Sequence, residues 1–266
     1  MSDLSMIPER LHGPFLKIDR AIQHFEFLQA QMDAFAESEA ASVRTEVDRE
    51  ARCYTLWITQ EKPIPLEWSV IIGDVAHNLR SALDHLVWQL ALLNLEGRRA
   101  PGDIYFPIYS DPDKYATSDV RKRLGRDLAG THLARVEEFH VNRRRDELWH
   151  ALRFLNALSR IDKHRSLQLV SAMLPNIRLK LTPEPRMIKT VTEYVHRGPL
   201  KQNAETELLR LRILDLEPAV NVQPELTFDI EFSEGAADRR LQVTPILGTV
   251  GESVTYVLES FIDVFA

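Results

Sequence analysis

Apolar residues in the first third of the chain recur at the three- and four-residue spacing of an α-helix. Between positions 13 and 38 this stripe consists of Phe15, Ile18, Ile22, Phe25, Leu28, Met32 and Phe35. Such spacing places the apolar side chains on one buried face, so we expect a core-packing helix over 13–38. A second long helix is predicted over 66–96, because Pro65 suits a helix start and Gly97 suits a stop.

The hydrophobic period changes to two between these helices. In the segment ARCYTLWITQ, two sets of side chains alternate: Tyr54, Leu56 and Ile58 against Cys53, Thr55 and Trp57. Strict alternation with aromatic and β-branched residues is typical of a strand. We therefore predict a strand or hairpin near 42–61, in which the preceding VRTEVD is the partner strand.

Beyond residue 100 the pattern first stays helical and then becomes extended. Helices are predicted at about 113–126, 131–140 and 145–163, the last with Leu148, Leu152, Leu155 and Leu158 on its apolar side. From Ser166 the strand-like segments are SLQLVSAM, IRLKLT, IKTVTEYV, ELLRLRIL, ELTFDIEF and RLQVTPI. The LPN between the first two predicts a turn. A final helix is expected at about 250–265.

Helices followed by strands favour an α+β architecture. We expect an N-terminal helical bundle with a mainly antiparallel β-sheet and a C-terminal helix. Two segments are predicted, a mainly helical 1–165 and a mainly antiparallel 166–266. If the strand near 42–61 joins the later sheet, the two segments form one interwoven domain.

Composition narrows the class of protein. The 266 residues carry a net charge of −6, which excludes the broadly basic surface of extensive nucleic-acid binders but leaves a local basic cleft open. The single cysteine, Cys53, allows no intrachain disulfide and no cysteine-rich metal site. A basic start followed by an apolar run is absent, as is any apolar run of the ~20 residues that a membrane span needs. We expect a cytoplasmic protein without a membrane partner.

Candidate chemistry is concentrated in GDVAHNLRSALDHLVWQLA, at 73–91 of the second long helix. At ~100° per residue, one sector of about 120° contains Asp74, His77, Asn78, Ser81, Asp84 and His85. Arg80 lies at its border. These residue types are poor helix formers, and Trp88 and Leu92 continue the sector. This favours a covered, hydrogen-bonded cluster; the alternative is a face solvated by water.

A second group of charges lies in RIDKHRSL, where the third strong helix gives way to the first later strand. It contains Asp162, Lys163, His164 and Arg165. Cations are favourable at a helix C-terminus, so one interpretation is a charged cap. The other is that Asp162, His164 and Arg165 close over the polar sector of the 66–96 helix.

Two basic runs offer local contacts for an anionic partner. One is Arg143, Arg144 and Arg145; the other is Arg121, Lys122, Arg123 and Arg126. Both are also typical of solvated surface segments. In an acidic chain they are the strongest local indication that RNA could bind.

Several chemistries find little support in the motifs. His77 and His85 are eight residues apart, about 12 Å along a helix, which is too far to share a metal without further ligands. Within 73–91 the helical pairs H-E-x-x-H and E-x-x-H do not occur, and the chain contains no G-x-S-x-G elbow, P-loop or G-x-G-x-x-G turn. We expect no cofactor. A metal-dependent hydrolase that uses His164 with the helix residues remains an alternative.

The segment RSALDH resembles the R-x4–6-H signature of HEPN domains, which are all-helical and often metal-independent ribonucleases. The resemblance implies that Arg80 and His85 are catalytic, with Asp84 and His77 beside them. Asp74, Asn78, Asp162, His164 and Arg165 would then support them. It also implies a homodimer, in which two copies of the motif meet.

The chemistry of that motif is physically reasonable. An arginine fork can hold a phosphate, and a histidine near neutrality can move a proton to or from a ribose hydroxyl. Two features depart from the family: Ser81 follows Arg80 where a stronger polar residue is usual, and on a straight helix Arg80 and His85 point about 140° apart. A non-enzymatic binding or interaction protein with a structural polar network is the alternative.

A broader resemblance covers most of the helical part. The segments GDVAHNLRSALDHLVWQLA, FPIY and LSRIDKHRSL, in this order, resemble a group of uncharacterised bacterial and phage proteins of similar size. That likeness implies no activity. Together with the HEPN-like motif, it suggests a ribonuclease of a bacterial or phage conflict system as the first hypothesis.

Overall fold

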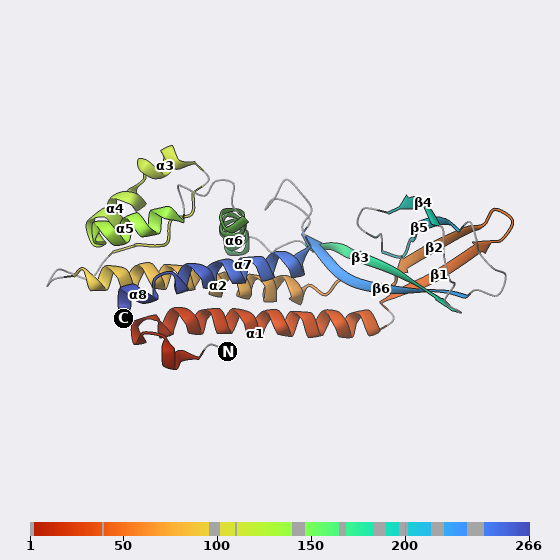
Figure 1. Cartoon of the computed structure of the whole chain (residues 1–266), viewed down its shortest axis with the longest axis horizontal. Coiled ribbons are helices and arrows are strands. Elements are labelled where there is room, and N and C mark those ends of the chain that lie inside the picture. The colour runs from red at the N-terminus through yellow and green to blue at the C-terminus, as the bar shows by residue number, and fades with distance from the viewer. Residues whose placement is uncertain are drawn as a thin grey trace.

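The computed structural model has its helices at one end and its strands at the other, along one long axis (Figure 1). It describes residues 3–38, 40–95, 102–109, 111–139, 147–164, 169–182, 190–196, 200, 202–213, 221–232 and 242–266. The expected α+β class is confirmed, with a helical N-terminal part, antiparallel strand ladders and a C-terminal helix.

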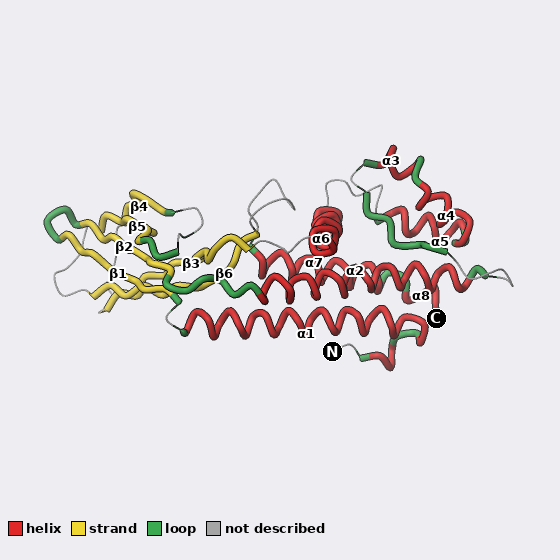
Figure 2. The backbone as a smooth tube through the Cα atoms, turned by 180° about the vertical axis from the view of Figure 1, so that it is seen from behind, coloured by secondary structure: helices red, strands yellow, loops and turns green. Residues whose placement is uncertain are grey.

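Three long helices lie side by side along the helical end, as both views show (Figures 1 and 2). They are α1 (Glu9–Glu37), α2 (Glu67–Leu93) and α7 (Val243–Glu259). α1 and α2 run antiparallel: Trp68, near the start of α2, stacks edge-on against Phe35, near the end of α1, at 5.2 Å between ring centroids. The sequence predicted α1 and α2 to within a few residues.

Shorter helices complete this end. A 3-10 turn, η1 (Leu4–Met6), precedes α1, and α8 (Ile262–Phe265) follows α7. Between α2 and the strand β3 (Leu169–Thr182), the chain forms α3 (Pro112–Ala116), α4 (Asp119–Asp127), α5 (Gly130–Glu138) and α6 (Glu147–His164). The predicted helix at 113–126 is therefore two helices, because the Ser118 side chain caps Arg121 N–H at 3.1 Å and starts α4 afresh.

The strands form two antiparallel groups. The four-stranded sheet has the order β1 (Ala41–Asp48), β2 (Cys53–Gln60), β5 (Glu205–Ile213) and β4 (Thr190–Val195). β3 (Leu169–Thr182) pairs with β6 (Asn221–Phe232). The hairpin predicted near 42–61 is confirmed, and its second strand pairs with β5 from the later part of the chain.

Two local predictions were wrong. The expected turn at LPN is absent, because β3 continues through it and pairs with β6 on both sides. The register shifts between Met173 and Asn176, so Pro175, which has no N–H to donate, lies at an irregularity of the ladder. The segment RLQVTPI is not a strand over its described residues: α7 begins at Val243, seven residues earlier than expected.

The start of α7 depends on a contact that is distant in sequence. Asp229 of β6 accepts hydrogen bonds from the Thr244 hydroxyl at 3.2 Å and from Thr244 N–H at 3.5 Å. Pro245 occupies the first turn, where a missing N–H costs nothing. A strand side chain therefore caps this helix, and the local pattern of alternating residues does not reveal it.

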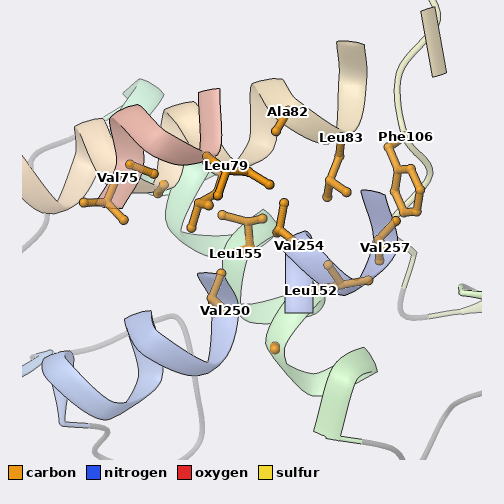
Figure 3. Close-up of a cluster of buried hydrophobic side chains, with 14 of the residues drawn as sticks. Val75, Leu79, Ala82, Leu83, Phe106, Leu152, Leu155, Val250, Val254 and Val257 are labelled. Atoms are coloured by element: carbon orange, nitrogen blue, oxygen red, sulfur yellow. The ribbon is translucent and has the colours of Figure 1, made fainter. Parts of the chain in front are cut away.

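The core lies between α2, α6 and α7. Figure 3 shows Val75, Leu79 and Leu83 of α2 meeting Leu152 and Leu155 of α6, and Val250, Val254 and Val257 of α7. All eight are buried, as are the four leucines predicted for the apolar side of α6. Among the described residues, no helix is both long and apolar enough to cross a membrane.

Candidate functional site

Arg80 is part of a buried polar network that ties α2 to the segment 102–109. Its Nη2 donates to Asp84 Oδ1 at 3.0 Å and to the carbonyl oxygen of Phe106 at 2.6 Å, and its Nε donates to Asp84 Oδ2 at 3.3 Å. Asp84 Oδ1 also accepts from the Phe106 N–H at 2.9 Å. The ion pair therefore holds both polar backbone groups of Phe106.

Helical spacing and an adjacent apolar anchor produce this network. Arg80 and Asp84 are four residues apart and face the same way on α2. The Phe106 ring is fully buried in the core beside Leu83 and Val257 (Figure 3). The Tyr105 ring lies 5.9 Å from the Arg80 guanidinium carbon, a cation–π distance. With Phe106 inserted into the core, its backbone needs buried partners, which Arg80 and Asp84 supply.

His85 does not join Arg80 within one chain. α2 is one continuous helix, and its side chains at 80 and 85 leave it in different directions: Arg80 is buried and His85 is exposed. Partial burial, and then the positive charge of Lys17, lower the pKa of His85, while Asp84 opposes the shift. The lowered pKa favours the neutral imidazole.

The rest of the polar sector is mainly open within the chain. Asp74 and His77 are exposed, Ser81 is half-buried, and Trp88 retains 37% of its surface. Only Asn78 is buried; its amide donates to the Asp74 carbonyl at 2.8 Å and accepts from Lys17 at 3.3 Å. The structure thus supports the solvated alternative at Asp74, His77 and His85.

The C-terminal end of α6 contacts α2 at Gly73, one residue before Asp74, where the polar sector begins. A Cβ added to Gly73 would lie 2.7 Å from Asp162 Cγ, so the glycine leaves the space that the carboxylate occupies. Asp162 therefore approaches α2 at Gly73, beside the polar sector and not over it. The His164 side chain and all of Arg165 lie outside the described residues.

The basic residues of α4 already have partners. Arg121 pairs with Glu137 at 3.1 Å, Lys122 with Asp119 at 3.0 Å and Arg126 with Asp127 at 2.7 Å. Arg123 donates to the Asp103 carbonyl oxygen at 3.0 Å. Three of the four cations in this run are therefore paired with nearby carboxylates, and the other run, 143–145, lies outside the described residues.

A cavity of about 400 Å³ opens between α1, α2 and α7. Ile22 and Phe25 of α1, which the sequence assigned to a packed core face, line it instead, and Ile22 is 40% exposed. Val75 and Leu79 form the α2 wall. The α7 wall contains two glycines and two glutamates. Its residues are Leu247, Gly248, Gly251, Glu252, Thr255, Tyr256 and Glu259.

The cavity is not apparent from the sequence, because the strand-like pattern of 240–246 hides the first turn of α7, which begins at Val243. A signal was present: a helix with an apolar face rarely carries two glycines three residues apart, each costing ~0.5–1 kcal/mol relative to alanine. Within the described part of the chain, no group of three or more histidine, cysteine, aspartate or glutamate side chains could hold a metal ion.

Comparison with known proteins adds no relative: no family model, curated protein or solved structure matches the chain. The geometry alone therefore carries the functional argument.

Proposed function

We propose that this protein is a non-enzymatic binding protein, in which the Arg80–Asp84 pair is structural and the cavity between α1, α2 and α7 receives a small ligand. The observation that carries the proposal is the open, largely apolar cavity of about 400 Å³. Pockets of ~300–1,000 Å³ with apolar walls and few polar groups are the usual sites for small molecules.

The arrangement of Arg80 supports a structural role for the polar network. Its guanidinium donates three hydrogen bonds to Asp84 and Phe106, and its side chain is only 10% exposed. These bonds occupy Nε and Nη2, and the remaining nitrogen, Nη1, is buried away from solvent. Holding the 102–109 segment against α2 accounts for the contacts of both residues.

The binding proposal can be tested with Nile red, a neutral apolar dye that fluoresces in dry pockets. Gly251→Leu fills the cavity, since a Cβ at Gly251 meets nothing within 4 Å. We expect saturable Nile red binding to the wild type and at least tenfold weaker binding to Gly251→Leu. Thr249→Leu, an exposed position of the same helix, is the matched control and should bind like the wild type. Equal binding by all three proteins would refute the proposal.

A second candidate is the HEPN-like, metal-independent ribonuclease, for which His85 gives a specific observation. Its imidazole is exposed, and its lowered pKa favours the neutral form, which can accept a proton. In this proposal RNA is the substrate, and a second copy of the chain brings its own motif against the exposed face that contains His77 and Trp88. A cytoplasmic location is part of both proposals.

Labelled RNA, with and without EDTA, separates the two candidates. The ribonuclease candidate expects cleavage that survives EDTA and is lost in His85→Ala. The binding-protein proposal expects RNA to stay intact with the wild type and with His85→Ala alike. Because His85 is exposed, its substitution should leave the fold unchanged, which a thermal melt checks.

A further inference from the structure

The ligand-facing side of α7 lacks side chains where the helix could have carried them. A Cβ at Gly248 or at Gly251 would meet no atom within 4 Å. Alanine at either position would therefore cause no clash and would stabilise the helix by removing the flexibility of glycine. Close packing against the described chain therefore does not require glycine at these two positions. Glycine instead leaves free space at this wall of the cavity, which a bound ligand can fill.

The charged groups at the cavity are of one sign. Glu252 and Glu259 are exposed, and no lysine, arginine or histidine is among the described residues that line the cavity. The two glutamates are seven residues apart, so they share a face of α7 and lie about 10.5 Å apart along its axis. No ion pair with a described residue occupies either carboxylate.

The remaining polar groups do not balance these negative charges. The Thr255 hydroxyl donates to the Gly251 carbonyl oxygen at 3.0 Å, within its own helix. Tyr256, which also lines the cavity and lies between the two glutamates in sequence, packs edge-on with Phe139 at 6.2 Å between ring centroids and still leaves 48% of its surface exposed. The faces of aromatic rings attract cations. The cavity therefore combines apolar walls with a rim that favours positive charge.

We propose that this cavity binds a small amphipathic cation, an organic ammonium or phosphonium. Its apolar groups occupy the space beside Gly248 and Gly251 against Ile22 and Phe25, and its charge lies near Glu252, Tyr256 and Glu259. This inference rests on the proposed binding function and adds the chemical class of the ligand. A neutral ligand would leave the two carboxylates unused, and an anion would be repelled by them.

Tetraphenylphosphonium and tetraphenylborate provide a matched pair of probes, because they have nearly the same shape and opposite charge. By isothermal titration calorimetry at low salt, we expect the phosphonium to bind the wild type with a dissociation constant on the order of 1–10 µM, as the ligand efficiency of such molecules suggests. The borate should bind at least tenfold more weakly. Added salt should weaken phosphonium binding, since the rim is exposed to solvent.

Two variants locate the site. Glu252→Gln/Glu259→Gln keeps the shape of the rim and removes its charge, so phosphonium affinity should fall at least tenfold. Gly251→Leu should abolish binding of the phosphonium while melting no lower than the wild type, and Thr249→Leu should bind like the wild type.

The outcomes separate the two proposals. If the borate binds as tightly as the phosphonium, or if the double glutamine variant retains full phosphonium affinity, the cation inference is wrong while the binding function stands. If neither ion binds and Nile red does not distinguish Gly251→Leu from the wild type, the cavity is not a binding site and both proposals fail.

Discussion

Replacement of Asp84 by alanine tests most directly whether the polar network is structural. Asp84 accepts two hydrogen bonds from Arg80 and one from the Phe106 N–H. In Asp84→Ala the guanidinium keeps only its bond to the Phe106 carbonyl oxygen. A buried cation then lacks its counter-ion, and a buried N–H lacks its acceptor.

The size of the effect follows from burial. Breaking a fully buried ion pair costs ~3–5 kcal/mol, but the Asp84 side chain is 31% exposed, against 10% for Arg80. We therefore expect a loss of about 3 kcal/mol in the free energy of unfolding, after discounting the pair for solvent. For a chain of this size that corresponds to a fall of about 6–12 °C in Tm.

Arg80→Met should cost less than Asp84→Ala, about 1–2 kcal/mol. The aspartate left behind can be hydrated. Arg80 Nη1 is buried without a hydrogen-bond partner in the wild type, so loss of that one nitrogen removes no hydrogen bond. The double variant Arg80→Met/Asp84→Ala should be less destabilised than the sum of the two single variants, because each removes the other's partner.

Circular dichroism melts of these variants provide the measurement. Asp74→Ala is the matched control: it removes the same side chain from the same helix, but at an exposed position, and should melt with the wild type. The structural interpretation is refuted if Asp84→Ala melts within 2 °C of Asp74→Ala, or if the two single variants are additive.

Three further predictions concern other parts of the fold. Gly73→Ala should raise Tm less in the wild type than in an Asp162→Ala background, because the exposed Asp162 carboxylate must move aside and this offsets part of the gain in helix propensity; equal effects in both backgrounds would contradict the contact. Burial raises the pKa of Tyr54 to about 12, and its hydroxyl has no hydrogen-bond partner. The folded state therefore favours the neutral phenol, and the wild type loses stability as pH rises from 10 toward 12. Tyr54→Phe should lose less stability over that interval in alkaline melts. At pH 7 it should melt at or above the wild type, because it removes the unpartnered hydroxyl. Asp229→Ala should cost about 1–2 kcal/mol because it uncaps α7 at Thr244, whereas Asp229→Asn, which keeps an acceptor oxygen, should melt near the wild type; matching losses in urea titrations of the two variants would exclude the cap.

Local sequence patterns specify the elements whose hydrophobic repeats are long and regular. The apolar stripe of α1, the alternation of β2 and the four leucines of α6 are local signals, because helix and strand periods decide which side chains share a face. Angles along α2 also placed Arg80 apart from His85, and the structure agrees: the first is buried and the second is exposed.

Which other elements pack against these faces depends on contacts between residues that are distant in the chain. Arg80 lay at the border of a polar sector in sequence, and only the approach of Phe106 from 26 residues away buries it. The helix α7 begins at Val243 because Asp229 of strand β6 caps it. Strand β3 continues through Pro175 because β6 pairs with it on both sides of that residue. The cavity depends in the same way on three helices that are distant in the chain. Periodicity fixes which side of an element is apolar, but what covers that side, or leaves it open for a ligand, follows from packing between residues that the sequence keeps far apart.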